Sequence, residues 1–155
     1  MFKPLFDTSP QLQEFFEAFE PSLDLRLWHK LLEEELAEYD EAVATGDKVN
    51  GLKEIADVLY VMTPYVHMGS AIETVGFLPA GVAALVTPLL NRALDTIEDA
   101  REVYSDAAIE EAFNRVHKSN MSKLGGDGKP IRREDGKILK GPNYKAPDLT
   151  DLVEV

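Results

Sequence analysis

Apolar residues recur at steps of three and four through most of the chain up to about residue 120, the spacing of one face of an α-helix. Ser9-Pro10 favours a helix start, with serine as the cap and proline in the first turn. The pattern predicts helices over 9–20, from 22–24 to about 45, from 48 to about 67, and from 105–106 to about 118. The sequence therefore predicts an all-α fold, a bundle of four to five helices.

The region between 70 and 106 predicts a further helix of about 20 residues or more, because its apolar positions keep the helical step. An apolar stretch from Phe77 to Leu90 is followed by a charged stretch that reaches Tyr104. Pro88 lies inside the segment and could kink it. The expected apolar stripe consists of Leu85, Leu89, Ala93, Ile97 and Ala100. Such a helix would fill a position in the core or in a subunit interface.

The composition changes after residue 124. Asp135-Gly136 lies between two short apolar runs, so 131–139 reads as a small β-hairpin. The residues after Gly141 predict an extended tail. We therefore expect a helical part over 1–124, followed by a hairpin and tail over 125–155 that belong to the same domain.

The length and charge of the chain exclude several classes of protein. With 155 residues it is expected to form one domain, and without cysteine it has neither a disulfide framework nor a thiolate metal site. A net charge of -12 argues against binding to nucleic acid. The most apolar window, 76–90, is too short to span a membrane, and the N-terminus is unlike a signal peptide. We expect a cytoplasmic protein without a membrane partner.

Two carboxylate pairs carry the most informative chemistry. Glu35 and Glu38 are three residues apart, as are Glu54 and Asp57, so each pair lies on one face of its helix. Turn-forming residues separate the pairs at 45–51. Two helices joined there would run antiparallel and could bring the pairs face to face.

Leu27 and Leu31 share the stripe of the first pair, which places the carboxylates at the edge of an apolar face. Carboxylates in such a place are costly unless they are paired or bound to metal. The stripe contains no Lys or Arg, so a hard divalent cation such as Mg²⁺ is one interpretation. The alternative is a solvated acidic face, which suits Glu33 and Glu41.

The first of these segments, Glu34-Glu35-Leu36-Ala37-Glu38, and the second, Glu54-Ile55-Ala56-Asp57, resemble the EExxE…ExxD signature of the all-α nucleoside triphosphate pyrophosphohydrolases. That superfamily includes MazG proteins, dimeric dUTPases, dCTPases and phosphoribosyl-ATP pyrophosphohydrolases. A second block, 112–123, is similar to the VHxSNMSK helix of the MazG-like branch, and the tail from Gly128 to Tyr144 is similar to that branch too. The segment 70–106 departs from its short members.

The resemblance implies Mg²⁺-dependent cleavage of a nucleoside triphosphate to the monophosphate and pyrophosphate, with Mn²⁺ as an alternative metal. It implies metal ligation by Glu35, Glu38, Glu54 and Asp57. We expect Glu34 to act as a catalytic base or to support the ligands, and Lys123 to bind phosphate. Asn120 would bind the sugar or base, and Trp28 would either pack in the core or stack on the base.

Three questions stay open from the sequence. A non-catalytic helical module that binds a partner would also carry an acidic face, while a di-iron bundle would need Glu-x-x-His pairs that are missing here. The substrate could be a canonical or noncanonical nucleotide, or phosphoribosyl-ATP.

A homodimer or homotetramer is expected, because Phe15, Phe16 and the 77–90 segment offer more apolar surface than one small bundle covers.

Overall fold

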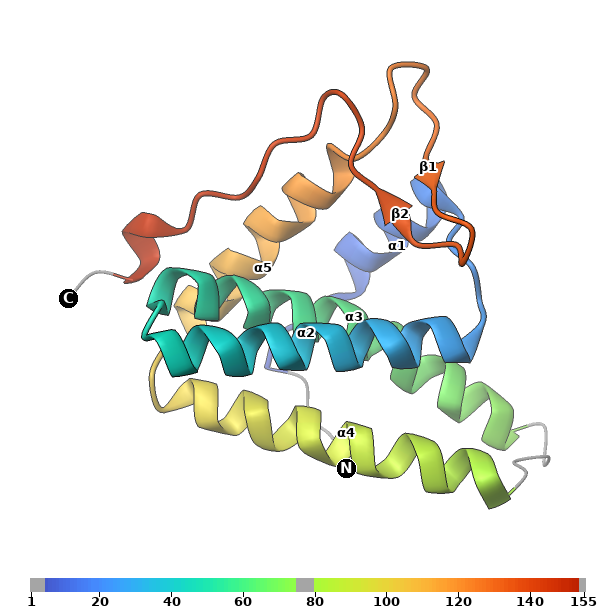
Figure 1. The fold of residues 1–155 in the computed structure, drawn as a ribbon, viewed down its shortest axis with the longest axis horizontal. Helices are drawn as coiled ribbons and strands as arrows, with labels where there is room; N and C mark the ends of the chain where they lie inside the picture. The colour runs from blue at the N-terminus through green and yellow to red at the C-terminus, as the bar shows by residue number, and fades with distance from the viewer. Residues whose placement is uncertain (1–4, 75–79, 154–155) are drawn as a thin grey trace.

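The computed structural model of the chain describes residues 5–74 and 80–153. Within these ranges it contains five α-helices, one two-stranded antiparallel hairpin and a short 3-10 turn (Figure 1). The elements are α1 (Ser9–Phe19), α2 (Leu25–Thr45), α3 (Lys48–Thr74), α4 (Ala80–Arg101), α5 (Asp106–Met121), β1 (Ile131–Arg132), β2 (Ile138–Leu139) and η1 (Thr150–Val153). The prediction of a helical bundle with a small C-terminal hairpin is confirmed.

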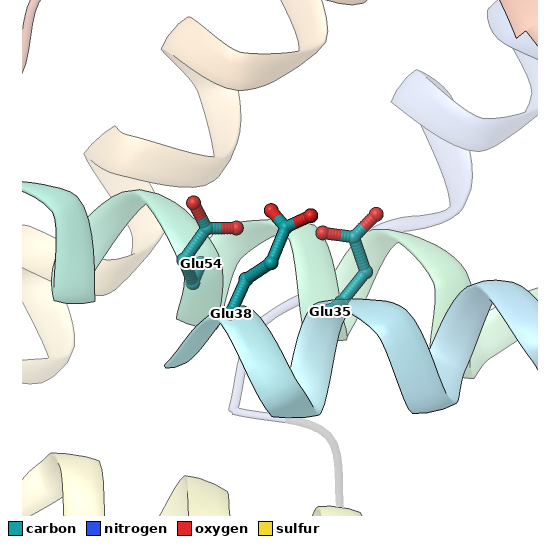
Figure 2. Close-up of side chains that lie close together, drawn as sticks. All are labelled: Glu35, Glu38 and Glu54. Atoms are coloured by element: carbon teal, nitrogen blue, oxygen red, sulfur yellow. The ribbon is translucent and has the colours of Figure 1, made fainter. Parts of the chain in front are cut away.

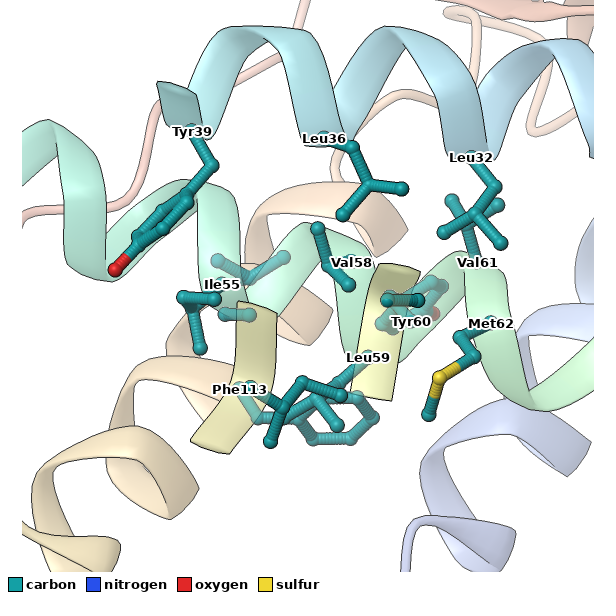
Figure 3. Close-up of a cluster of buried hydrophobic side chains, with 14 of the residues drawn as sticks. Leu32, Leu36, Tyr39, Ile55, Val58, Leu59, Tyr60, Val61, Met62 and Phe113 are labelled. Atoms are coloured by element: carbon teal, nitrogen blue, oxygen red, sulfur yellow. The ribbon is translucent and has the colours of Figure 1, made fainter. Parts of the chain in front are cut away.

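The antiparallel pair α2 and α3 forms the centre of the molecule (Figure 1). Gly46 ends α2 in the left-handed conformation, with φ 71°, and the Asp47 carboxylate accepts a hydrogen bond from the Asn50 backbone N–H at 3.0 Å. Apolar side chains of the two helices interlock between them and extend to Phe113 of α5 (Figure 3). The tight turn fixes the register that brings the two acidic faces together.

Two helix ends differ from the predictions. Thr8, and not Ser9, occupies the N-cap position of α1, and the Ser9 N–H donates to the Asp7 carboxylate at 2.9 Å. Helix α3 continues past His67 to Thr74 and contains Pro64. Proline inside a helix costs about 3 kcal/mol or more. Packing of Val66 and Met68 against the core helps to offset that cost.

The added helix α4 packs against α2 and α3, so it fills a core position. Four of the five predicted stripe positions are buried, namely Leu89, Ala93, Ile97 and Ala100. The fifth, Leu85, is 47% exposed, and Val86 is buried instead. The part of the predicted apolar stretch at 77–79 lies outside the described residues. None of the helices in the described ranges is long and apolar enough to cross a membrane.

The hairpin pairs Ile131 with Leu139 and turns through Gly136, which has φ 92°. Beyond it, the tail runs back along α5 (Figure 1). It is not extended throughout, because it closes in η1. Leu149 is buried in the core, and the Lys145 carbonyl accepts a hydrogen bond from the Ser119 hydroxyl at 2.7 Å. These contacts hold the C-terminal tail against α5 and the core.

Candidate functional site

Three of the four predicted metal ligands meet on one side of the α2–α3 pair. Glu35 and Glu38 project from α2 and Glu54 from α3, and their carboxylates point the same way (Figure 2). One oxygen of each lies within 4.8 Å of an oxygen of the other two. The helical spacing of the first pair and the antiparallel turn together produce this arrangement, as the sequence predicted.

Glu54 is the most unusual member of the cluster, because its side chain is buried and only partly paired. It is 2% exposed. Its Oε1 accepts a hydrogen bond from Lys53 Nζ at 3.0 Å, while Oε2 is buried with no partner among the described residues. A buried charged oxygen without a partner is costly. A bound cation would supply the missing interaction.

Asp57, the fourth predicted ligand, makes a different contact. Its Oδ2 accepts a hydrogen bond from Lys53 Nζ at 2.8 Å, so this lysine bridges Asp57 and Glu54. The assumption that the acidic stripe lacks a cation was therefore wrong. Lys53 is four residues before Asp57, and side chains at that spacing are neighbours on a helix.

The gathered carboxylates resist ionisation together. Burial, followed by the charges of Asp57, Glu38 and Glu54, raises the pKa of Glu35 to about 8. Burial also raises the pKa of Glu54 to about 7, although Lys53 partly opposes the change. Like charges in a poorly solvated place disfavour one another. A divalent cation would reverse this balance by favouring the ionised forms.

A hollow of about 620 Å³, counting the part open to solvent, adjoins the acidic cluster. Its lining includes the apolar side chains of Phe15, Trp28, Leu31, Val61 and Ile138. The lining also includes polar groups from Glu35, Asp57, Asn120, Lys123 and Lys137. An apolar surface beside groups of both charges suits a ligand that has a flat organic part and a charged part.

Trp28 packs in the core, which is one of the two roles that the sequence left open for it. It is buried, its Nε1–H donates to the Ser22 carbonyl at 2.7 Å, and its ring stacks on Phe16 at a centroid distance of 5.9 Å. It also lines the hollow. These contacts hold the Trp28 ring in one position at the edge of the hollow. Its stacking on a base stays a prediction.

Asn120 and Lys123 come from the end of α5 and the turn after it, and both line the hollow. Burial lowers the pKa of Lys123, while the nearby charges of Asp57 and Glu35 raise it. Lys123 therefore lies near the acidic cluster. Asn120 is buried and lies beside Tyr60, whose hydroxyl is 2.9 Å from His117 Nδ1.

Glu34 lies outside the three-carboxylate cluster. Its Oε2 accepts a hydrogen bond from Lys137 Nζ at 3.0 Å, and Lys30 Nζ is 3.9 Å from its Oε1. Glu34 therefore connects α2 to the hairpin. Its expected catalytic role stays a prediction.

Lys53 and Tyr60 were not predicted as parts of the site, whereas the resemblance of the tail suggested that Lys137, Lys140 and Tyr144 could close over it. The four-residue step to Asp57 could have identified Lys53. Tyr60 had no comparable signal, since its place depends on how α5 packs. The sequence could not show where the hairpin carries Lys137. The sequence predicts a hairpin, but not the surface that it covers.

The model of the phosphoribosyl-ATP pyrophosphohydrolase family matches residues 7–70. This segment runs from just before α1 into α3, so it includes the predicted ligands at 35, 38, 54 and 57. It excludes the end of α5 and the hairpin. Comparisons with curated proteins and with solved structures gave no match.

Proposed function

We propose that the protein is a Mg²⁺-dependent nucleotide pyrophosphohydrolase, because the model of the phosphoribosyl-ATP pyrophosphohydrolase family matches residues 7–70, which carry the acidic cluster. Its reaction would cleave a nucleoside triphosphate between the α and β phosphates. The products would be a nucleoside monophosphate and pyrophosphate. The family implies a pyrophosphohydrolase activity, and the choice of substrate is our proposal.

The observation that carries the proposal is the buried Glu54 Oε2, which has no partner within the described residues. It lies in a group of three carboxylates whose oxygens are within 4.8 Å of one another. Mg²⁺ prefers such hard oxygen ligands. The donor set therefore fits the metal, with Glu35, Glu38, Glu54 and Asp57 as the residues that would hold it. When bound, it would supply positive charge at the phosphates and lower the pKa of a bound water.

The chain's own residues would bind and orient the nucleotide. Lys123 would contact phosphate, because its ammonium group lies in the hollow near the acidic cluster. Asn120 would hydrogen-bond to the sugar or the base. Trp28 would offer an apolar face to the base, an interaction worth about 1–3 kcal/mol in other proteins. Positioning and electrostatic stabilisation of this kind supply most of the catalysis in phosphoryl transfer.

A second candidate is hydrolysis of phosphoribosyl-ATP itself, since this substrate gives the matching family its name. Both candidates present the same triphosphate chain to the acidic cluster. They differ in the organic group attached to the α-phosphate, which the apolar wall of the hollow would select. A helical module without catalytic activity is the remaining alternative, and it predicts no turnover of either substrate.

The test is a panel of ribonucleoside and deoxyribonucleoside triphosphates with phosphoribosyl-ATP, each incubated with the protein and Mg²⁺ and monitored by ³¹P NMR. We expect equal amounts of monophosphate and pyrophosphate from at least one substrate, and no reaction in chelator. Release of orthophosphate, or no turnover of any substrate, would contradict the proposal.

We also propose that the protein assembles as a homodimer or homotetramer. The reason differs from the one the sequence suggested, because Phe15 is in the core and Phe16 packs on Trp28. Among the described residues, the large apolar side chains with the highest exposure are instead Leu23, Val43, Leu85 and Val103, at 72%, 60%, 47% and 55%. Leu23 also lines an apolar hollow together with Leu12, Phe16, Pro64 and Met68.

A further inference from the structure

The C-terminal hairpin forms part of the wall of the hollow, although it lies outside the segment that matches the family. Gly136, Lys137 and Ile138 line the hollow beside Glu35 and Asp57. The hairpin lies near the start of α2 and the end of α1 (Figure 1). Two far-separated parts of the chain thus enclose one space.

Three contacts hold the hairpin at this place. The Arg132 guanidinium donates to the backbone carbonyls of Phe19 and Glu20 at the end of α1, the second at 3.0 Å. Lys30 Nζ on α2 is 3.7 Å from the Asp135 carboxylate. A Cβ added to Gly136 would lie 3.3 Å from the Ser22 Cβ, so the turn packs closely against the segment before α2. The position of Lys137 is therefore set by the fold on both sides.

The ammonium group of Lys137 retains capacity to bind a ligand. Among the described residues, its one hydrogen-bond partner is Glu34, at 3.0 Å. An ammonium group can donate three hydrogen bonds. Both side chains are about one-third exposed, at 35% and 33%, and ion pairs with access to water contribute little stability. A ligand with a higher negative charge could therefore displace Glu34 without a large loss.

The charges around Lys137 indicate the kind of ligand. Burial lowers the pKa of Lys123, and the charges of Lys140 and Lys137 lower it further, so the ammonium groups of Lys123 and Lys137, which both line the hollow, repel each other. The carboxylate cluster lies beside them and would hold a cation. A ligand that satisfies both lysines and also binds a divalent cation must carry several negative charges close together. A pyrophosphate group meets this requirement, whereas a single carboxylate does not.

We propose that Lys137 binds the pyrophosphate part of the substrate and that Glu34 positions the lysine at the hollow when no substrate is bound. The inference rests on the proposed function for the identity of the substrate. It gives Glu34 a positioning role in place of the catalytic role expected from the sequence. In this proposal the hairpin contributes a substrate-binding residue to the site.

The test is calorimetric titration of inorganic pyrophosphate, in the presence of Mg²⁺, into the wild type and three variants. Lys137→Met removes the charge and keeps an apolar side chain of similar length, so we expect the dissociation constant to rise about tenfold or more. Lys137→Arg keeps the charge and should restore binding to within a few-fold of the wild type. Lys129→Met is the matched control, because Lys129 is exposed in the loop before the hairpin and does not line the hollow. It should bind as the wild type does.

A second titration with Mg²⁺ alone separates ligand binding from a general change of the site. Lys137→Met should keep the wild-type affinity for Mg²⁺. Unchanged pyrophosphate binding by Lys137→Met, or an equal loss of Mg²⁺ affinity, would overturn the inference. Because the titrations need no turnover, this outcome is distinguishable from failure of the proposed function, which would appear as a wild type that hydrolyses no substrate.

Discussion

Glu35 and Glu54 make the stability of the metal-free protein depend on pH. Their folded-state pKa values of about 8 and about 7 exceed the ordinary 4.5, so the folded state binds protons that the unfolded state has released. Stability should therefore fall as the pH rises from about 5 to 8. We expect the melting temperature in chelator to decrease over this range, and saturating Mg²⁺ to offset the decrease.

The control for this prediction is Glu35→Gln, which removes one ionisable group and keeps the shape. Its melting temperature in chelator should depend less on pH between 5 and 8, and Mg²⁺ should raise it less than it raises that of the wild type. Differential scanning calorimetry measures both. A wild type that becomes more stable from pH 5 to 8 without metal would contradict the account.

Lys123→Ala tests the phosphate contact on α5. A hydrogen bond to a charged group is worth about 1.5–3 kcal/mol, so kcat/KM should fall about ten- to hundredfold. The rise in melting temperature on addition of Mg²⁺ should persist, because Lys123 is not among the proposed ligands. Steady-state kinetics and thermal melts check the two parts. Unchanged kinetics would show that Lys123 is a solvated charge beside the site.

At the scale of elements, the chain after the hairpin packs closely against the end of α5 at Gly141. A Cβ added to Gly141 would lie 2.5 Å from the Leu124 carbonyl oxygen and 2.7 Å from that of Lys123. Gly141→Ala must therefore push the chain away from the turn that holds Lys123. Overpacking of this kind costs about 1–3 kcal/mol. At about 2–4 °C per kcal/mol for a chain of this size, the melting temperature should fall clearly.

The same variant should also raise KM, because Lys123 would shift with the turn. Gly126→Ala is the control, since an added Cβ there meets no atom within 4 Å. It should change neither melting temperature nor KM by more than a small amount. If both variants melted as the wild type does, the close packing at Gly141 would not be a constraint.

The sequence predicted the elements that a local pattern determines. The spacing of Glu35 and Glu38 and the turn at Gly46 were enough to place the acidic cluster on one side of the α2–α3 pair. Tertiary contacts decided the rest. Helix α3 continues past its predicted end near His67 to Thr74, and Val66 and Met68 pack on the core at that point. The place of Lys137 depends on how Arg132 contacts the end of α1, which no spacing along the chain encodes.

At the scale of the whole molecule, the prediction is self-association. Several large apolar side chains are exposed on the single chain, Leu23 most of all at 72%. Burial of such surface favours association at about 25 cal/mol per Å² of apolar area. Light scattering should give a mass of at least twice the 17.2 kDa of one chain. A monomer at micromolar concentration would contradict the proposed assembly and leave the site proposal intact.

We propose that the acidic cluster holds the Mg²⁺ that the reaction requires, and one measurement tests this most directly. It is the rate of pyrophosphate release from the best triphosphate as a function of Mg²⁺ concentration, for the wild type and Glu54→Gln. The variant keeps the shape of the side chain and removes the buried charge whose Oε2 has no partner in the described part of the chain.

Loss of groups that merely support a metal ligand costs about 10–100-fold in activity, so loss of a ligand should cost at least about 100-fold. We predict a wild-type rate that is absent in chelator and saturates with Mg²⁺, and a rate for Glu54→Gln that is lower by that factor at every Mg²⁺ concentration. Release of pyrophosphate in chelator, or a variant with the wild-type dependence on Mg²⁺, would contradict the account.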